Sequence, residues 1–280
     1  MPAKKKKNGL EIMGYFVWWS MEGINFSREE FEKLIEQSPL DISPPKLCHR
    51  TAFLEAVRWV KAKSHTHHLL IRTVSKDKEA HYFALVDEKI DIENKQAGYT
   101  HEATLRFDQE TFAVTCNQLH RAHETVKQRF QENVDNLNSY ELRRWVQKIL
   151  DRCRNISVRD KGGLYYVDLK YTDVLLGLEQ IFDSVPGADF FIVEQIDSER
   201  SKKSIWKAFV EDLNSKITKF REALQEGKYS SNKGWENAIA QFKELKEEVG
   251  FYADRLSFTG SDLNKNIEEL TGEFRRQLVD

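Results

Sequence analysis

Histidine and cysteine are the residues with the most obvious capacity for chemistry, and two groups of them lie close together in the sequence. The groups are His65, His67 and His68, and Cys116, His120 and His123. A structural zinc site needs four ligands, usually supplied as two close pairs. His65 and His67 would share one face of a strand, and His120 and His123 would share one face of a helix. We find no convincing second pair of ligands for either group. We therefore predict no metal site and no cofactor, and interpret these histidines as solvated or core residues.

Covalent catalysis also lacks the residues it needs. The chain contains no GxSxG nucleophile elbow and no Walker lysine loop. Gly162 and Gly163 are too few to cradle phosphates and indicate a two-residue hairpin turn, where positive φ is required. The carboxylates are scattered over charged segments, where pairing with Lys or Arg four residues away is their usual role. The sequence predicts a protein that is not an enzyme and has no catalytic residue.

Positive charge gathers between residues 139 and 172, where eight Lys or Arg and four Asp or Glu give a local charge of +4. Arg144, Lys148 and Arg152 follow one another at a spacing of one helical turn. The opposite side of the same helix carries an apolar stripe from Leu142 to Cys153. The candidate nucleic-acid contacts are Arg143, Arg144, Lys148, Arg152, Arg154, Arg159 and Lys161.

A basic helix followed by a hairpin with a basic tip is the arrangement with which winged-helix proteins contact DNA. The likeness is partial, because a winged helix has three helices before its wing, whereas here the expected order is α-β-β-α-β. The alternative is a solvated arginine face on a helix whose other side is core. If the segment binds DNA, its cations mainly neutralise phosphates, so that affinity falls steeply with salt.

The composition limits the remaining classes of protein. The chain has 280 residues, of which 40% are hydrophobic and 31% are charged, and its formal net charge is -2. Such a composition is typical of a globular protein with long exposed helices. Three cysteines without CxxC spacing suit a reducing compartment. The apolar stretch at residues 12–19 is too short to span a bilayer. We expect a cytoplasmic protein that does not act at a membrane.

The elements that carry these residues belong to an α+β fold with four expected segments: a disordered basic tail (1–9), an N-terminal α/β module (10–138), a central α-β-β-α-β module (139–197) and a helical tail (198–280). The N-terminal module should contain an aromatic strand at 12–19, which is either core or an edge for a partner. A capping box from Ser27 to Glu30 then starts a helix. Two hairpins of an antiparallel sheet and an amphipathic helix at 119–137 complete the module.

The central module consists of the basic helix, the hairpin, a helix capped by Thr172 and a strand at 190–196. In the tail, apolar residues from Trp206 to Leu224 are spaced alternately by four and three positions, and a similar spacing runs from Trp235 to Leu256. An average spacing of 3.5 is the coiled-coil period. We expect a coiled-coil-like set of two or three antiparallel helices, packed on one another or partly on a partner.

Several of these segments together resemble an uncharacterised bacterial and phage family, over about residues 12–225. They are Ser27-Arg28-Glu29-Glu30 after an aromatic strand, VDEKIDIENKQAGY at 86–99, and LRRW followed by RDKGGLYYV between 142 and 167. The resemblance implies no activity. It implies a setting among phage, plasmid or other mobile-element genes, including genes next to those of AAA+ ATPases.

Three functional hypotheses follow. The first is a non-enzymatic accessory factor of a phage or mobile-element system that contacts nucleic acid through the basic helix and hairpin. The second is a protein–protein adaptor or oligomerisation subunit, for example of an AAA+ ATPase machine, that acts through residues 198–280. The third is a hydrolase or nuclease whose site has no recognisable motif. No small-molecule substrate is evident, and acidic residues of the tail such as Glu244, Glu247 and Glu248 could cover the basic face.

Overall fold

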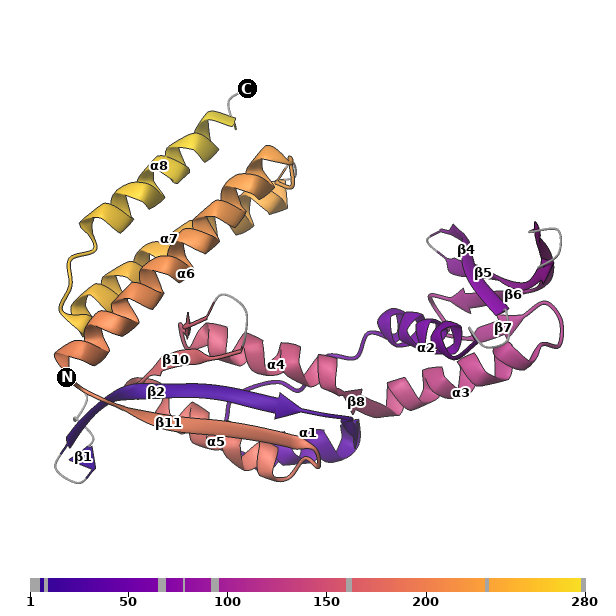
Figure 1. Cartoon of the computed structure of the whole chain (residues 1–280), viewed down its shortest axis with the longest axis horizontal. Coiled ribbons are helices and arrows are strands. Elements are labelled where there is room, and N and C mark those ends of the chain that lie inside the picture. The colour runs from indigo at the N-terminus through magenta and orange to yellow at the C-terminus, as the bar shows by residue number, and fades with distance from the viewer. Residues whose placement is uncertain are drawn as a thin grey trace. The chain divides into compact units, whose positions relative to one another are not determined.

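The computed structural model describes residues 6–7, 10–64, 69–77, 79–91, 96–159, 163–229 and 232–277 (Figure 1). The fold is α+β, with antiparallel sheets and eight α-helices in these residues. The chain forms two compact units. The split unit consists of Met1–Met21 and Val146–Asp280, and the inserted unit is Glu22–Trp145. The chain therefore leaves the split unit after its first strands and returns to it much later.

Strand β2 (Leu10–Met21) organises the split unit, because three other strands pair with it. Figure 1 shows β2 between β10 (Tyr165–Asp168) and β11 (Ala188–Ile196), both of which pair with it antiparallel. The short strand β9 (Ile156–Ser157) pairs with β10. Lys6–Lys7, within the tail expected to be disordered, forms the two-residue strand β1 against the start of β2. Strands β2 and β11 are thus neighbours although more than half of the chain separates them.

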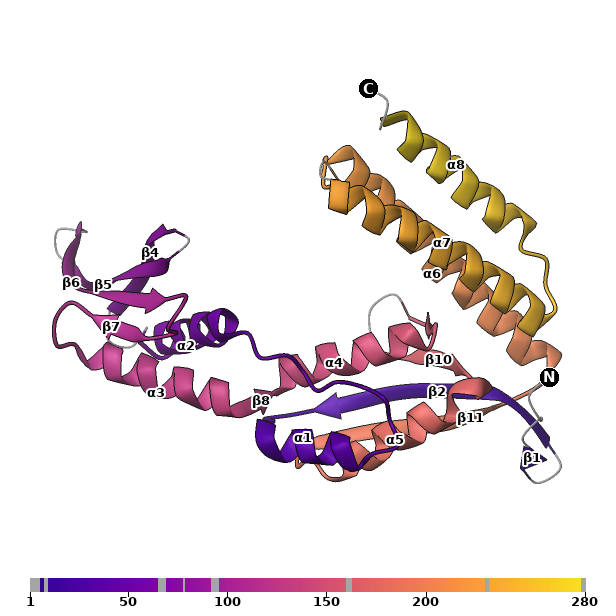
Figure 2. The ribbon, with the colours of Figure 1, turned by 180° about the vertical axis from the view of Figure 1, so that it is seen from behind.

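One face of this sheet is covered by a helix. The split unit contains the 3-10 turn η2 (Leu169–Tyr171) and the helices α5 (Thr172–Asp183), α6 (Glu199–Gln225), α7 (Asn232–Leu256) and α8 (Ser261–Gln277). Helix α4 (Ser139–Arg152) begins in the inserted unit and ends in the split unit. Helix α5 runs along β11 (Figure 2), where the rings of Phe182 and Phe190 are 5.3 Å apart. A hydrogen bond of 3.0 Å also joins the hydroxyls of Tyr15 and Thr172. Tyr15 and Val17 are buried on this side.

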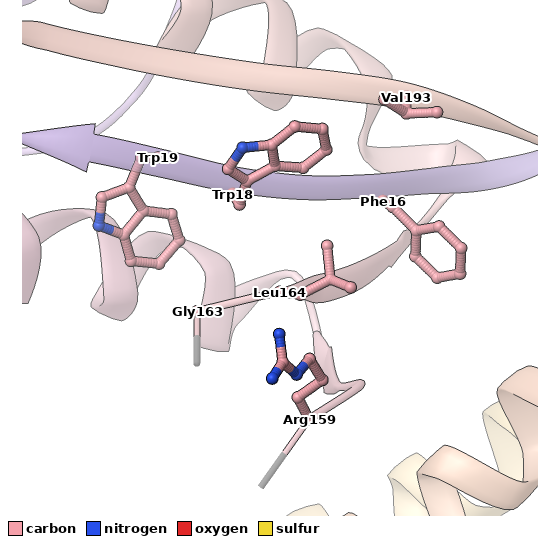
Figure 3. Close-up of a pocket in the computed structure, with 7 residues that line it drawn as sticks. All are labelled: Phe16, Trp18, Trp19, Arg159, Gly163, Leu164 and Val193. Carbon is pink, nitrogen blue, oxygen red and sulfur yellow. The ribbon is translucent and has the colours of Figure 1, made fainter. Parts of the chain in front are cut away.

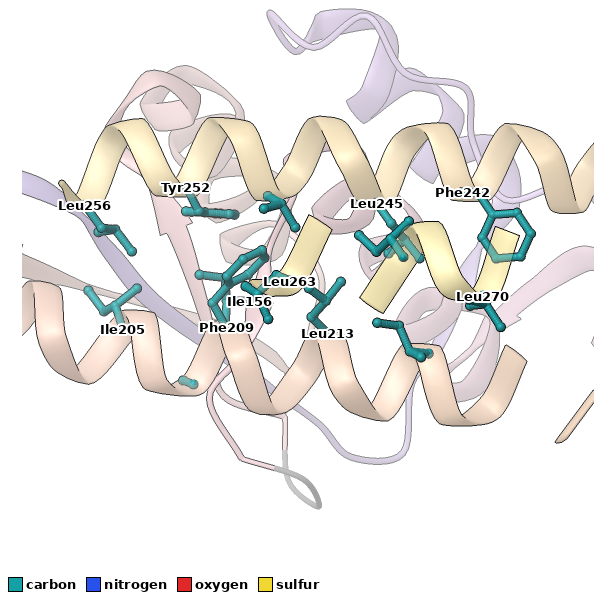
Figure 4. Close-up of a cluster of buried hydrophobic side chains, with 14 of the residues drawn as sticks. Ile156, Ile205, Phe209, Leu213, Phe242, Leu245, Tyr252, Leu256, Leu263 and Leu270 are labelled. Atoms are coloured by element: carbon teal, nitrogen blue, oxygen red, sulfur yellow. The ribbon is translucent and has the colours of Figure 1, made fainter. Parts of the chain in front are cut away.

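The three C-terminal helices share a cluster of buried side chains in the split unit (Figure 4). The ring of Phe209, early in α6, lies 5.0 Å from that of Tyr252, late in α7, whereas Phe220 lies 5.0 Å from Phe242. Helices α6 and α7 are therefore antiparallel. Their cluster also includes Ile156 and Tyr166 of the sheet. The apolar repeat of the tail is thus buried within the chain, and its coiled-coil character stays a prediction.

The inserted unit has its own core between two helices and a sheet. Its elements are β3 (Asn25–Ser27), α1 (Arg28–Gln37), α2 (His49–Ser64), β4 (Leu69–Lys76), β5 (Ala80–Asp91), β6 (Gln96–Asp108), β7 (Val114–Cys116), α3 (Arg121–Asp135) and β8 (Asn136–Asn138). Strands β4 to β7 pair in sequence order, and β3 pairs with β8. The expected antiparallel hairpins are confirmed. Phe53 of α2 is fully buried and stacks on Phe107 at 4.5 Å.

Three local expectations have clear outcomes. The oxygen of Ser27 accepts a hydrogen bond from the N–H of Glu30, as the capping box predicts. Thr172 does not cap α5: it is the first helical residue, and its hydroxyl donates to the carbonyl of Leu169. The hairpin after α4 is present, but its turn is longer than two residues, because the N–H of Val158 donates to the carbonyl of Leu164 at 2.9 Å. Five residues therefore connect the two sides.

The units differ from the expected modules. Residues 10–21 belong to the same unit as the central and C-terminal segments, and the boundary near residue 138 falls within seven residues of the point where the chain re-enters the split unit. The physical reason is the pairing of β2 with β10 and β11, which joins the start of the chain to its centre.

Candidate functional site

Helix α4 positions the predicted basic residues. Its start is set by Asn138, whose side-chain oxygen accepts hydrogen bonds from the N–H groups of Tyr140 and Glu141 at 2.9 and 3.0 Å. The apolar stripe is buried, since Leu142, Trp145, Val146, Ile149 and Leu150 are each at most 5% exposed. With one side of the helix buried, the side chains at the other positions face outward.

The exposed side of α4 carries the predicted row of cations. Arg144, Lys148 and Arg152 are exposed, as is Arg143. The Arg144 guanidinium lies 5.6 Å from the centre of the Tyr140 ring. Within the residues that the structure describes, no ion pair neutralises Arg144, Lys148 or Arg152. These three residues therefore keep their charge available on the surface.

Arg154 does not belong to this row. It follows the end of α4 with a positive φ of 52°, a conformation that costs a non-glycine residue about 1 kcal/mol. Its guanidinium donates to the Glu247 carboxylate at 3.0 Å and lies 5.7 Å from the centre of the Phe251 ring. Its carbonyl accepts a hydrogen bond from the Tyr252 hydroxyl. Arg154 therefore ties α4 to α7, and an acidic residue of the tail does occupy this one cation.

The hairpin places one further cation near the sheet. Arg159 is exposed, and its carbonyl accepts a hydrogen bond from the Ser157 hydroxyl at 3.0 Å. Gly163 begins the return of the chain with a φ of +45°, a conformation that glycine adopts without strain. Lys161 and Gly162 lie outside the described residues. The predicted basic tip is thus represented by Arg159.

Sequence reasoning missed an aromatic surface on the sheet. We use this name for five residues on the face opposite α5: Phe16, Trp18, Leu164, Phe191 and Val193. The strand register pairs Trp18 with Phe191 and Phe16 with Val193. The rings of Trp18 and Phe191 stack 5.1 Å apart at an angle of 15°. Phe191 is 40% exposed and Val193 is 44% exposed.

A cavity of about 640 Å³ opens over this surface (Figure 3). Phe16 and Trp18 of β2 contribute to its wall, together with Val193 of β11, Trp19 and Leu164. Figure 3 shows Arg159 reaching toward Leu164 from the hairpin. Among the described residues that line the cavity, Arg159 is the one that carries a charge. This part of the cavity therefore combines aromatic rings with a cation.

On the same sheet face, the residue of β10 that pairs with Phe16 is covered by the helical tail. Tyr166 pairs with Phe16 across the strands but is fully buried against α6 and α7. Its hydroxyl donates to the Met13 carbonyl at 3.0 Å, and burial raises the pKa of this phenol well above its usual range. The helical tail thus covers the sheet face around Tyr166, and the cluster that they form contacts Phe16 at its border. Phe191 and Val193 of the aromatic surface stay exposed.

The histidine and cysteine groups have local roles where they are described. The Nδ1 atom of His120 accepts from the N–H of Ala122 and caps α3, and His123 donates from Nε2 to the Val114 carbonyl at 3.2 Å. Burial raises the pKa of the Cys153 thiol to about 11. Among the described residues no three His, Cys, Asp or Glu side chains are placed to hold a metal ion. The group at residues 65, 67 and 68 lies outside them.

A family of unknown function, DUF6744, matches residues 12–279. The chain belongs to this family. The expected resemblance to an uncharacterised family is confirmed, and the DUF6744 match extends beyond residue 225 to include the last helices. No curated protein and no solved structure matches the chain. In the described part, this DUF6744 member has no helix with the length and apolar character needed to cross a membrane.

Proposed function

We propose that this protein binds nucleic acid through Lys148, Arg152 and Arg159 of the split unit. The observation that carries the proposal is that these three cations are exposed and take part in no ion pair in the described residues, whereas the neighbouring Arg154 is paired with Glu247. A surface cation without an acidic partner is available to a phosphate. The net charge of the chain is close to neutral, so that the attraction comes from this local row.

The spacing of the row suits a polyanion. Side chains four residues apart on a helix lie about one turn of 5.4 Å from one another. Lys148 and Arg152 can therefore contact successive phosphates of one strand. Arginine adds geometric selectivity, because its planar guanidinium donates two parallel hydrogen bonds to a phosphate. Such contacts favour binding without fixing the base sequence.

Charge reversal of the row tests the proposal. The variant Lys148→Glu/Arg152→Glu/Arg159→Glu should bind a labelled oligonucleotide more than about tenfold more weakly than the unchanged chain in fluorescence anisotropy at about 50 mM salt. The plot of log affinity against log salt should also become shallower, by about 0.7 to 0.9 for each lost phosphate contact.

The matched control changes the same charge elsewhere in the split unit. Lys203, Lys219 and Lys243 are exposed on α6 and α7, and their reversal to Glu should leave the affinity within about threefold of the original. Equal losses in the two variants would show a general charge effect and contradict a defined site. Binding that neither variant changes would also reject the proposal.

The adaptor hypothesis has less support. The apolar residues that predicted a coiled coil at residues 198–280 are largely buried in the chain's own cluster. An interface through this tail would have to use the outer sides of its helices, where Ile239 is 55% exposed. Light scattering on the intact chain distinguishes the adaptor hypothesis from the nucleic-acid hypothesis. If the intact chain is an oligomer and the substitution Ile239→Ser dissociates it, the adaptor hypothesis is favoured.

A further inference from the structure

We infer that the aromatic surface binds the bases of single-stranded nucleic acid, while the cations described above hold its phosphates. This inference rests on the proposed function, for which it names the substrate class. Its starting point is that Trp18 and Phe191 stack on each other while Phe191 stays 40% exposed and Trp18 is only half-buried, although large aromatic residues are usually buried.

The sheet face carries aromatic rings in an arrangement on which nucleic-acid bases can stack. Trp18 and Phe191 lie at opposing positions on adjacent strands, with Phe16 and Val193 at the opposing positions two residues along. Every base has a π-face, and stacking on a protein aromatic ring contributes about 1–3 kcal/mol per base. In a duplex the bases are paired and stacked inside, where a sheet surface does not reach them. Exposed rings on a sheet therefore favour an unpaired strand.

The charge of Arg159 favours a strand of nucleic acid over an apolar protein segment as the ligand of the cavity. Arg159 projects into a cavity whose other described lining residues are uncharged. A strand of nucleic acid needs a ring for the base and a cation for the phosphate that follows, and both are present here. An apolar helix would gain nothing from the guanidinium. Bound beneath such a helix, Arg159 would lose hydration without gaining a partner.

The borders of the surface limit its ligand to a short segment. On one side Tyr166 is buried under α6 and α7. On the other side the sheet becomes polar, because the Ser20 hydroxyl donates to the Asp189 carboxylate at 2.9 Å. The open cavity of about 640 Å³ is within the range of about 300–1,000 Å³ that small-ligand sites occupy. Few bases of a longer strand would therefore be held at one time.

The test uses the full chain and three labelled ligands: single-stranded DNA, single-stranded RNA and a DNA duplex of the same length. The variant Trp18→Ser/Phe191→Ser should bind both single strands about tenfold more weakly and bind the duplex as before. Trp18→Phe keeps a stacking ring and should restore most of the affinity. Ile239→Ser removes a comparably exposed apolar side chain from α7 and should change nothing. The ratio of DNA to RNA affinity distinguishes the two sources of the strand.

Several outcomes would overturn the inference. If the Ser variant keeps single-strand affinity while charge reversal of the basic row lowers it, the proposed function stands and the aromatic surface has no part in it. If no ligand binds to the unchanged chain, both fail. If the Ser substitutions dissociate an oligomer and leave binding intact, the surface is an interface between copies of this chain.

A second measurement covers the case in which the Ser variant does not fold. Addition of single strand should quench tryptophan fluorescence in the unchanged chain, and Trp18→Phe should lose a distinct part of that quenching. Circular dichroism shows whether each variant is folded. Quenching that is the same in both folded proteins would overturn the inference.

Discussion

The two large sheets of the molecule differ in the burial of their phenylalanine and tryptophan residues. In the four-stranded sheet of the inserted unit, Phe83 and Phe107 are buried under α2 and α3, together with Phe53 of α2. In the five-stranded sheet of the split unit, aromatic residues occupy both faces, Trp18 is only half-buried and Phe191 is exposed. Burial in a core accounts for Phe53, Phe83 and Phe107. It accounts for Trp18 and Phe191 only in part, and for this reason we assign these two residues a ligand.

A pair of truncations gives the largest expected contrast. Phe53→Ala should lower the free energy of unfolding by about 4 kcal/mol, because it leaves a cavity in a closed core. Trp18→Ala should cost only about 1 kcal/mol, mainly its stacking on Phe191. Urea unfolding followed by circular dichroism measures both. A cost at Trp18 as large as that at Phe53 would mean that Trp18 is a core residue, and the contrast between the sheets would disappear.

The close packing of the five-stranded sheet can be tested at Gly14. A Cβ atom at this position would lie 2.5 Å from the carbonyl oxygen of Val167 and equally close to the Tyr166 hydroxyl. Because a backbone atom cannot move aside easily, Gly14→Ala should destabilise the protein by about 2 kcal/mol in the same unfolding measurement. Gly272→Ala meets no atom within 4 Å and serves as the control on α8. Equal stability of both variants would contradict the pairing of β2 with β10.

The smallest expected effect is the pH dependence of stability that arises from His81 in the four-stranded sheet. His81 is buried, its Nε2 atom has no hydrogen-bond partner in the described part of the chain, and burial lowers its pKa. The unfolded chain therefore takes up a proton more readily, so that stability falls as the pH drops below about 6.5.

Unfolding at a series of pH values should show a weaker decline in His81→Phe than in the unchanged protein. His101 is exposed, and His101→Phe should leave the decline as it was. An identical pH dependence in all three proteins would mean that His81 is not the titrating group.

Local patterns predicted the elements better than their partners. The capping box at Ser27, the hairpins of the inserted unit and the buried stripe of α4 all depend on residues close in sequence, and all are present. The pairing of β2 with β10 and β11 joins residues more than 140 positions apart. The alternation of side chains along a segment identifies a strand but does not show which other strands pair with it. For this reason the expected modules differ from the two units.

The same limit applies to the candidate site. Four-residue spacing predicted that Arg144, Lys148 and Arg152 would share the exposed side of a helix. It could not show that Arg154 would turn away with a positive φ to contact Glu247. The tryptophans of β2 were interpreted mainly as core, because sequence does not show where a distant helical tail stops covering a sheet. The position of Tyr166 under that tail, and of Trp18 beyond it, depends on tertiary packing alone.

The late pairing of β2 also has a consequence for biosynthesis. Residues 10–21 leave the ribosome long before their partners β10 and β11, which end only at residues 168 and 196. The inserted unit, by contrast, is complete after residue 145 and makes its contacts within itself. Domains generally fold as units in the order of synthesis. The inserted unit should therefore fold first. Until β10 and β11 have been synthesised, the aromatic strand β2 lacks these two partners, and we expect chaperones to bind the nascent chain at β2.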